Sequence, residues 1–270
     1  MAPNNKNLKI LSNKKLSIQI SLSGLSFCIL QSDTNTITAL KEFKFDKKIN
    51  PFEALDHLKH LFSTEKQLQT NFDAVLIIHE NELSTLVPMA LFNKDYLADY
   101  LKFNSKILQS DFISHDVIHN NESVNVYVPY VNINNFIYEK FGEFTFKHFS
   151  TLLLENILEK ADNGKMYVHV ADKHFEIIII SNGKLALYNT FEYKNEKDFI
   201  YYILFAAEQL NLNPETLNLV LLGAINEDDE LYKIAYQYIR NINFGSRNDT
   251  YKYTETPTTN HSHYTLIQSF

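Results

Sequence analysis

Histidines occur at two places in the sequence with spacings that could serve metal chemistry. His115 and His119 are four residues apart, a spacing that places two imidazoles on one face of a helix, where they can share a zinc ion. Residues 111–118 read as a strand, however, and no third ligand accompanies the pair, which favours two surface polar residues. His261 and His263 stand in a polar stretch, and an isolated pair of this kind binds metal weakly. The sequence therefore predicts no metal-ligating residue.

The candidate nucleophiles lack the neighbours that would activate them. Residues 23–26 read Ser-Gly-Leu-Ser, which differs from the Gly-x-Ser-x-Gly elbow of serine hydrolases. Cys28 is the single cysteine and stands in an apolar run, which excludes disulfides and thiolate metal clusters and predicts a buried structural thiol. No two neighbouring carboxylates have a spacing that suggests hydrolysis of a glycosidic bond. The sequence does not exclude a pair whose members are distant along the chain. We therefore assign no catalytic residue from the sequence.

Composition and charge restrict the class of partner. The 270 residues are 45% apolar and 21% charged, an ordinary globular composition, and the formal net charge is −7. Arg240 and Arg247 are the two arginines and the lysines are dispersed, so we expect no binding of nucleic acid, which needs clustered cations. The most apolar runs, 175–180 and 199–207, are shorter than the ~20 residues of a transmembrane helix. The first 15 residues contain no apolar signal-peptide core, so we expect a cytoplasmic protein.

The apolar pattern of the chain occurs twice, and this repeat indicates the elements that would position a site. Each copy begins with alternating apolar and polar residues, as in a half-buried strand, and continues with two more strands, a helix and an apolar strand. In the first copy we expect strands at 15–22, 27–30, 36–45 and 74–78. In the second copy we expect strands at 165–172, 175–180, 184–193 and 219–222, followed by a helix that begins at Asp228 and Asp229. The shared order is β-β-β-α-β.

Local signals indicate the helix of the first copy. Asn50 can cap a helix in which Pro51 takes the first position and Glu53 completes a capping box. A one-sided apolar stripe follows, as in a helix that covers a sheet. The stripe consists of Phe52, Leu55, Leu58, Leu61 and Phe62.

The second copy has matching signals. Asn182-Gly183 predicts a tight hairpin between two strands, because both residues tolerate positive φ. Asn195 can cap the helix that follows. This helix carries aromatic residues on more than one face, which favours burial against the second sheet over an exposed patch for a partner. They are Phe199, Tyr201, Tyr202 and Phe205.

Between the two copies lies a stretch with its own strands and helices. We expect strands at 83–87, 111–118, 123–129 and 143–149 and helices at 94–103, 132–141 and 151–160. The polar segment 160–164 ends in glycine and is the best candidate for a domain boundary. We predict a first domain at 1–160 with a small inserted subdomain at about 94–150, a second domain at 161–244, and a loosely attached polar C-terminal tail at 245–270.

Two such units flanking a cleft resemble the sugar kinase, Hsp70 and actin superfamily, whose units have a ribonuclease H-like β-β-β-α-β-α order. The middle stretch is similar to the small subdomain inserted in the pilus-assembly and cell-division branch. The similarity rests on Pro88 and the segments 95–101, 124–128, 136–142 and 144–149. The chain also resembles an uncharacterised family of Bacteroidetes proteins with this fold. The resemblance covers about residues 15–242 and implies an α/β, actin-like ATPase fold with an interdomain cleft.

The resemblance also implies where Mg-ATP would be held, and these positions have changed. The first strand turn of the superfamily reads Asp-x-Gly-Thr-Thr, and here Ser21 stands in place of the acid and Ser23 in place of the glycine. The second turn should read Asp-x-Gly, and here His169 replaces the acid. The bulky Lys173, His174 and Phe175 follow where backbone must approach phosphate. The adenosine loop, usually rich in glycine, keeps Gly223 alone.

A site without these acids cannot place Mg²⁺, and side chains on the turns block the amide cradle. We therefore predict a pseudo-ATPase: a non-catalytic actin-like scaffold or protein-interaction module that binds no cofactor. The alternative is a nucleotide- or small-ligand-binding protein, or a divergent enzyme, that uses the cleft and binds ATP with Mg²⁺ or another ligand. The cleft residues would then be Ser21, Ser23, Ser26, His169, Asp172, Lys173 and Gly223.

The expected partner is an unidentified protein or a second copy of the chain. Relatives use the inserted subdomain for association, so the resemblance implies a partner surface at about residues 94–150. Polymerisation, as in actin relatives, is a further alternative. A membrane protein is also kept among the partners, although the chain itself has no transmembrane segment.

Overall fold

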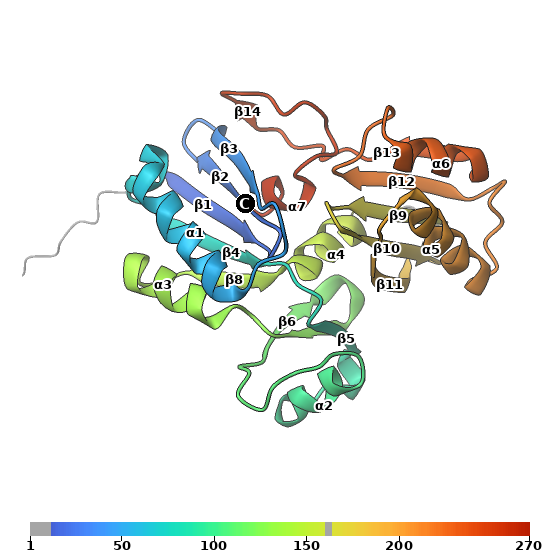
Figure 1. Cartoon of the computed structure of the whole chain (residues 1–270), viewed down its shortest axis with the longest axis horizontal. Coiled ribbons are helices and arrows are strands. Elements are labelled where there is room, and N and C mark those ends of the chain that lie inside the picture. Colours follow the sequence, from blue (N-terminus) through green and yellow to red (C-terminus); the bar gives the residue numbers. More distant parts are fainter. Residues whose placement is uncertain (1–11, 160–163) are drawn as a thin grey trace, which may run out of the picture.

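The computed structural model describes residues 12–159 and 164–270. The chain forms two α/β halves side by side, and a small third sheet is attached to the first half (Figure 1). The α/β class and the duplicated unit are as predicted. The expected domain boundary at 160–164 falls mainly on residues 160–163, which lie outside the described residues.

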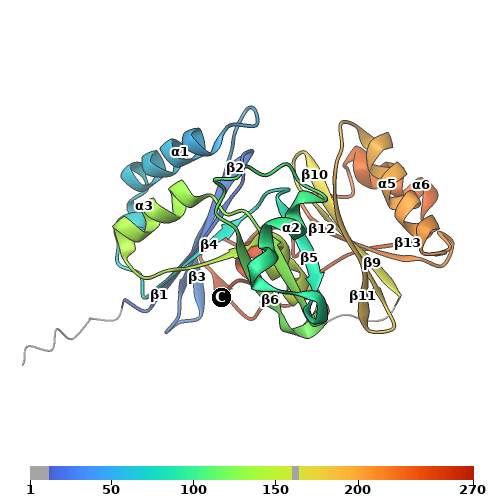
Figure 2. The ribbon, with the colours of Figure 1, turned by 90° about the horizontal axis from the view of Figure 1, so that it is seen from below.

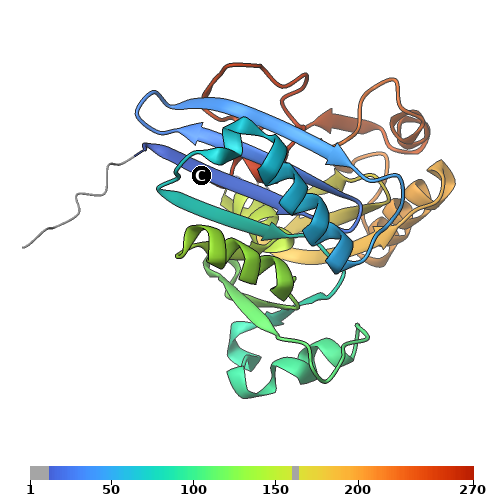
Figure 3. The ribbon, with the colours of Figure 1, turned by 60° about the vertical axis from the view of Figure 1, so that its left-hand side comes forward.

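The first half is built on a six-stranded sheet in the order β14-β3-β2-β1-β4-β8. β1 pairs antiparallel with β2 and parallel with β4, and β8 extends the sheet parallel to β4. The strands are β1 (Lys14–Ile20), β2 (Gly24–Gln31), β3 (Thr36–Lys44), β4 (Ala74–His79), β8 (Thr145–His148) and β14 (Lys252–Tyr253). Helices α1 (Pro51–Thr64) and α3 (Val131–Phe141) lie side by side on its outer face (Figure 3).

The second half repeats this arrangement in a five-stranded sheet, β11-β10-β9-β12-β13. β9 pairs antiparallel with β10 and parallel with β12, as β1 does with β2 and β4. The strands are β9 (Lys165–Val170), β10 (His174–Ser181), β11 (Lys184–Glu192), β12 (Asn218–Gly223) and β13 (Asn241–Phe244). Helices α5 (Glu196–Gln209) and α6 (Glu230–Tyr238) cover the outer face (Figure 2). The predicted β-β-β-α-β order is confirmed in both copies.

Both repeat helices begin at the predicted caps. The Asn50 side chain accepts hydrogen bonds from the backbone N–H groups of Phe52 and Glu53, and the Glu53 carboxylate accepts from the Asn50 N–H. The Asn195 side chain likewise accepts hydrogen bonds from the N–H groups of Lys197 and Asp198 at the start of α5. Each cap stabilises its helix by about 1 kcal/mol. The expected stripe is wrong at Phe52, which is 74% exposed, because it points away from the face on which Ala54 is buried.

The aromatic residues of α5 divide between the core and the surface. Phe199 is fully buried and packs edge-on against Phe175 of the second sheet. Tyr201 and Phe205 are exposed and stack on each other with ring centroids 6.0 Å apart. The prediction that these aromatic residues are buried against the second sheet is therefore correct for Phe199 and wrong for Tyr201 and Phe205.

A small antiparallel sheet, β5-β7-β6, occupies the stretch between the two copies. Its strands are β5 (Ser84–Pro88), β6 (Ser114–Ile118) and β7 (Ser123–Tyr127), and α2 (Leu97–Lys102) packs on it. The small sheet thus begins before residue 94, and β8 within the expected segment 94–150 joins the first sheet. His115 lies in β6, and the exposed His119 follows that strand.

The small sheet is fixed to a helix that lies between the halves, α4 (Phe149–Glu159). The Asp116 carboxylate accepts hydrogen bonds from the backbone N–H of His148 and the hydroxyl of Thr151, both at 2.9 Å. A carboxylate at this end of a helix interacts favourably with the helix dipole. The Asn125 amide also donates to the Ser150 and Thr151 hydroxyls. These contacts tie the small sheet to the centre of the molecule.

The centre is one apolar core shared by both main sheets. Helices α4 and α7 (Tyr264–Ile267) fill the space between their inner faces. Leu153 of α4 and Ile267 of α7 are fully buried there with Ile78 of the first sheet and Ile178 of the second. Cys28 belongs to the same core and is fully buried, as predicted for a structural thiol.

The prediction of a loosely attached tail at 245–270 is wrong. The segment leaves β13, adds β14 to the edge of the first sheet and returns into the shared core as α7. The buried Arg247 guanidinium donates to the Asp249 carboxylate and to the carbonyls of Thr259 and Ser262. His261 is likewise buried and stacks on Phe244. The polar composition concealed this anchoring, because α7 is four residues long and too short to give a helical pattern.

Candidate functional site

A cavity of about 440 Å³ lies between the two halves at the carboxyl ends of β1, β9 and β12. Six of the seven candidate cleft residues line it: Ser21, Ser23, Ser26, His169, Asp172 and Gly223. The C-terminal segment forms a further wall with residues 255–259 and 262–265, and Phe149 and Tyr264 contribute from α4 and α7. Lys173 is the exception. It lines an adjoining cavity of about 110 Å³, and its side chain is 77% exposed.

The turn between β1 and β2 is held by hydrogen bonds to the side chain of one of its own residues, Ser21. The Ser21 hydroxyl accepts hydrogen bonds from the backbone N–H groups of Ser23 at 3.2 Å and Gly24 at 3.0 Å. The Ser21 N–H donates to the Gly24 carbonyl. A Cβ at Gly24 would lie 2.8 Å from the Phe43 carbonyl oxygen, so this turn requires glycine. A phosphate bound at this turn would need free backbone N–H groups. Those of Ser23 and Gly24 are already hydrogen-bonded within the chain.

The turn between β9 and β10 is also held by internal hydrogen bonds. The Ala171 N–H donates to the His174 carbonyl at 2.9 Å, and the Tyr193 hydroxyl contacts the Ala171 and Asp172 carbonyls at 2.8 and 3.0 Å. Asp172 and Lys173 pair at 3.6 Å on the rim of the cavity. The side chain that turns inward is His174, the first residue of β10.

Gly223 ends β12 where the chain passes very close to β9. Its φ is +84°, and a Cβ there would lie 2.3 Å from the Val170 carbonyl oxygen and 3.0 Å from His169 Nε2. The Gly223 N–H donates to the carbonyl of His261 in the C-terminal segment at 2.9 Å. The remaining glycine of this loop is thus required by packing, and its amide is bonded to the chain's own C-terminal segment.

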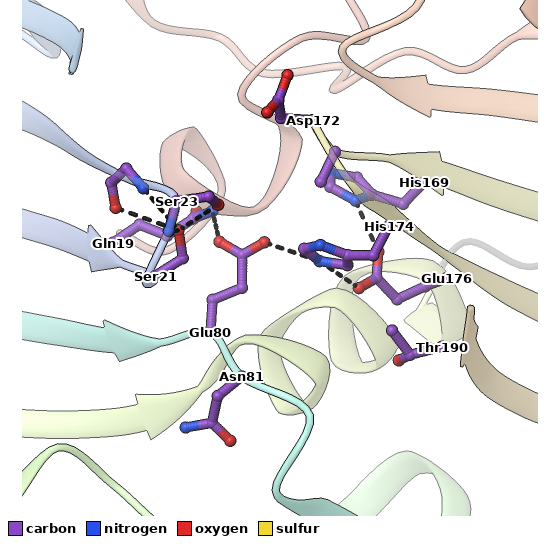
Figure 4. A network of polar contacts seen from close by, with 12 residues as sticks. Gln19, Ser21, Ser23, Glu80, Asn81, His169, Asp172, His174, Glu176 and Thr190 are labelled. Atoms are coloured by element: carbon purple, nitrogen blue, oxygen red, sulfur yellow. Dashed lines mark hydrogen bonds and ion pairs between the residues drawn. The ribbon is translucent and has the colours of Figure 1, made fainter. Parts of the chain in front are cut away.

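A network of charged side chains joins the two halves where the two cavities adjoin, as Figure 4 shows. Glu80 lines both cavities, His169 lines the larger one, and His174 and Glu176 line the smaller one. His174 Nε2 lies 3.1 Å from a carboxylate oxygen of Glu80 and 3.3 Å from one of Glu176. The second Glu176 oxygen lies 3.0 Å from His169 Nδ1, and the Gln19 amide donates to the second Glu80 oxygen at 2.8 Å. Glu80 follows β4 of the first half, whereas His169, His174 and Glu176 belong to the second.

The charges of this network are coupled. Burial alone would raise the pKa of Glu176, but the His174 charge and hydrogen bonds from His169 and His174 outweigh it and lower the pKa to about 2. Burial opposes a charged His174, yet Glu176 and Glu80 hold its pKa well above the ordinary value of 6.5. At neutral pH the centre of the network is therefore an imidazolium between two carboxylates.

Sequence reasoning missed Glu80 and Glu176 and treated His174 only as a bulky obstacle. Two signals could have found them. Glu80 directly follows a central parallel strand, and the carboxyl ends of such strands point to the cleft in open α/β sheets. His174 and Glu176 are two residues apart in a strand, which places both on the same face.

These residues do not fit Mg-ATP bound in the manner of the fold family. The backbone N–H groups of Ser23 and Gly24 already donate to the Ser21 hydroxyl, and the carboxylates of Glu80 and Glu176 already share an imidazolium. Across residues 12–159 and 164–270, no group of three His, Cys, Asp or Glu side chains could hold a metal ion. The same described part of the chain contains no helix long and apolar enough to cross a membrane.

Comparison with protein-family models decides the family. The model described as "Protein of unknown function (DUF3822)" matches residues 3–242. The chain belongs to the DUF3822 family. The matched region contains both repeat units and all the candidate cleft residues, whereas β14 and α7 lie beyond it. No curated protein matches this DUF3822 chain.

Several solved structures are similar to this DUF3822 protein. A Bacteroides thetaiotaomicron protein with actin-like ATPase fold and unknown function has a TM-score of 0.76 and 24% identity, over 86% of this chain and 91% of that one. The ethanolamine utilization protein EutJ from Carboxydothermus hydrogenoformans has a TM-score of 0.49 and 8% identity, over 86% and 84%. AlfA from a Bacillus subtilis plasmid has a TM-score of 0.46 and 7% identity, over 94% and 97%. The first of these structures, from Bacteroides thetaiotaomicron, shows that this DUF3822 chain has the actin-like ATPase fold.

Proposed function

We propose that this DUF3822 protein is a non-catalytic actin-like module, a pseudo-ATPase that works by binding a protein partner in the cytoplasm. The observation that carries the proposal is the Ser21 hydroxyl, which bonds the amides of Ser23 and Gly24 in the first turn. Phosphoryl transfer depends almost wholly on positioned phosphates and on neutralisation of their charge. A turn whose N–H groups are hydrogen-bonded to its own side chain can neither position a phosphate nor neutralise its charge.

The proposal places the partner surface on the small sheet and its connections. Six large apolar side chains between residues 89 and 112 are exposed, with Leu91 and Leu108 at 70% and Phe103 at 89%. The other three are Met89, Tyr96 and Phe112. Exposed apolar residues gathered on one small unit are typical of protein-binding surfaces. Lysines and aspartates are equally frequent among residues 89–112, so the charge of this unit favours a protein over an anionic membrane surface.

The absence of catalysis is tested with ATP and Mg²⁺. A ligand at 100 times its Kd would add about 2.7 kcal/mol to the free energy of unfolding. We expect no thermal shift, no calorimetric heat and no release of phosphate at millimolar Mg-ATP. Saturable Mg-ATP binding accompanied by turnover would overturn the pseudo-ATPase assignment.

The partner surface is tested by affinity capture with crosslinking from cells that contain the protein. A variant with Leu91, Phe103 and Leu108 changed to serine should lose the specific partners of the wild type. The matched control changes Tyr138 and Tyr236, which are 65% and 66% exposed on α3 and α6, to serine and should retain them. Light scattering of the same proteins separates self-association from a different partner. Equal capture by both variants would contradict this placement.

A second candidate function is binding of a small ligand in the cavity. Its volume of about 440 Å³ lies within the ~300–1,000 Å³ of small-molecule sites. Hydroxyl groups line much of it, and the acids Glu42, Glu80, Asp172 and Glu255 outnumber Lys44, which favours neutral polyhydroxyl compounds over polyphosphates. Thermal shifts with nucleosides and sugars, compared with ATP, test this candidate. Stabilisation by ATP alone would contradict the preference for neutral ligands.

A further inference from the structure

One buried contact between charged groups joins the two halves beside the large cavity, in the wall of the adjoining cavity of about 110 Å³. His174 begins β10 in the second half, and Glu80 follows β4 in the first, with 3.1 Å between the imidazole and the carboxylate. The side chains are 21% and 10% exposed, so solvent screens the contact weakly. Lys48 and Glu192 also pair across the gap at 3.7 Å, but both are more than half exposed, and such pairs contribute little.

The contact has three members, and its charge balance depends on one proton. His174 lies between Glu80 and Glu176, which come from different halves. With a charged imidazolium, the group has one positive and two negative charges. Without that proton, two buried carboxylates from opposite halves face each other with no cation between them, and like charges in a poorly solvated site repel.

We propose that His174 is a proton-operated clamp: its imidazolium holds Glu80 of the first half against Glu176 of the second, and loss of its proton lets the cavity open. The core around α4 and α7 lies next to the cavity, because Phe149 and Tyr264 from these helices line it, and in this proposal that core stays packed when the cavity opens. The clamp controls access to the cavity whether or not a ligand binds there. It therefore stands independently of the proposed function.

The direction of the response follows from linkage. In the closed form Glu176 and Glu80 hold the pKa of His174 well above its ordinary value. In an open form Glu80 moves away while Glu176, on the same strand as His174, stays beside it, so the pKa of His174 is lower than in the closed form. Closure is therefore fully supported below the open-form pKa of His174 and is lost as the pH rises through the closed-form pKa. Between the two pKa values the ratio of closed to open molecules falls about tenfold for each pH unit.

Other titratable groups also face the clamp, from both halves. The charged or titratable groups near His174, Glu80 and Glu176 are Asp46, Lys47, Lys48, Glu82, Tyr130, His148, His169, Asp172, Lys173, Tyr188 and Glu192. The pKa of Glu176 is about 2 and burial lowers that of His148 to about 4, so neither changes charge from neutral to alkaline pH. Burial raises the pKa of Tyr188 beyond this range. His169 is tested by its own variant.

The test measures the distance between the halves. Asp56 on α1 and Lys197 on α5 are exposed and are replaced by spin-labelled cysteines, while the native Cys28 is fully buried and stays unlabelled. We expect a narrow distance distribution at about pH 6 and a second, longer population that grows toward about pH 9. His174→Ala should show the longer population at every pH, and added imidazole should restore the short distance at low pH.

Three variants act as controls. His174→Lys keeps its charge to higher pH, so the short distance should persist through about pH 9. His60→Ala removes an exposed histidine of α1 and should respond to pH as the wild type does. His169→Gln should keep the pH response, because the clamp proton resides on His174.

Identical distance distributions of the wild type at both pH values would overturn the clamp, as would a His174→Ala protein that stays as closed as the wild type. Circular dichroism of each labelled protein shows whether it is folded. If His174→Ala does not fold, the lysine variant decides. Persistence of its short distance at about pH 9 supports the clamp, and opening identical to that of the wild type overturns it.

Discussion

The hydroxyl of Ser269 lies 2.7 Å from the hydroxyl of Ser17, so the next-to-last residue of the chain contacts the first strand of the fold. Ser17 is fully buried in β1, where a hydroxyl needs a hydrogen-bond partner. The Gln268 amide donates to the Arg247 carbonyl, which fixes the same end of the chain to the start of the C-terminal segment. The segment that leaves the second half is therefore a structural part of the first.

This role of the C-terminal segment predicts a large effect of Arg247→Ala. The substitution removes a buried guanidinium and its hydrogen bonds to the Asp249 carboxylate and to the carbonyls of Thr259 and Ser262. We expect a loss of about 3 kcal/mol in the free energy of unfolding, measured by urea titration. Arg240→Ala is the control, because Arg240 is exposed, and it should change stability by less than about 0.5 kcal/mol. Equal effects of the two substitutions would show that the segment is not anchored through Arg247.

The close approach of β12 to β9 predicts that Gly223→Ala is far more harmful than Gly183→Ala. Both glycines have positive φ, at +84° and +72°, so both alanine variants bear backbone strain of about 1 kcal/mol. A Cβ at Gly223 also meets the Val170 carbonyl at 2.3 Å, whereas a Cβ at Gly183 meets open space. We expect Gly223→Ala to lose at least about 2 kcal/mol more than Gly183→Ala in urea titrations. Similar losses would mean that β9 and β12 separate at little cost.

The sequence predicts the repeated units well because their signals are local. Asn50 and Asn195 cap the helices at which the patterns place them, and the alternating strands fall within a few residues of their expected bounds. Phe52 is the exception within an otherwise correct helix. A count of apolar residues does not show that Ala54, with its small side chain, takes the buried position.

The site is predicted less completely because its key contact is not local. Ser21, His169 and Gly223 are found through their places in the repeated turns. Glu80 and His174 are 94 positions apart, and no periodicity shows that the ends of β4 and β10 face each other across a gap. The position of one half relative to the other is set by the shared core. Part of that core is α7, which lies in a stretch of polar sequence.

The closed first turn predicts that Ser21→Asp does not restore Mg-ATP binding. The substitution returns a carboxylate to the position that holds it in the actin-like superfamily. The new carboxylate can accept hydrogen bonds from the N–H groups of Ser23 and Gly24, as the Ser21 hydroxyl does. The carboxylates of Glu80 and Glu176 still contact His174. We expect no calorimetric heat with millimolar Mg-ATP from Ser21→Asp alone. Tight binding by this variant would show that one lost acid, rather than the closed turns, prevents nucleotide binding.

Two buried histidines outside the clamp predict the behaviour in acid. Burial lowers the pKa of His79 to about 3 and that of His148 to about 4, so both are neutral in the fold and gain a proton on unfolding below pH 6.5. The unfolded chain then binds more protons, and stability falls as the pH falls. Each histidine contributes about 1.4 kcal/mol for every pH unit between 6.5 and its lowered pKa.

His148→Gln should therefore reduce the dependence of the unfolding free energy on pH between about 6 and about 4.5, where Glu176 stays ionised in the fold. Glutamine can still contact the Ser150 hydroxyl and the Asn81 carbonyl that bond the imidazole, but it binds no proton. Urea titrations at several pH values measure this slope, and we expect it to decrease by about 1.4 kcal/mol per pH unit. The control is the same substitution at a histidine that is exposed on α1, His57→Gln. A slope that is the same in wild type and His148→Gln would mean that His148 takes up its proton without unfolding, which its full burial between α4 and the small sheet argues against.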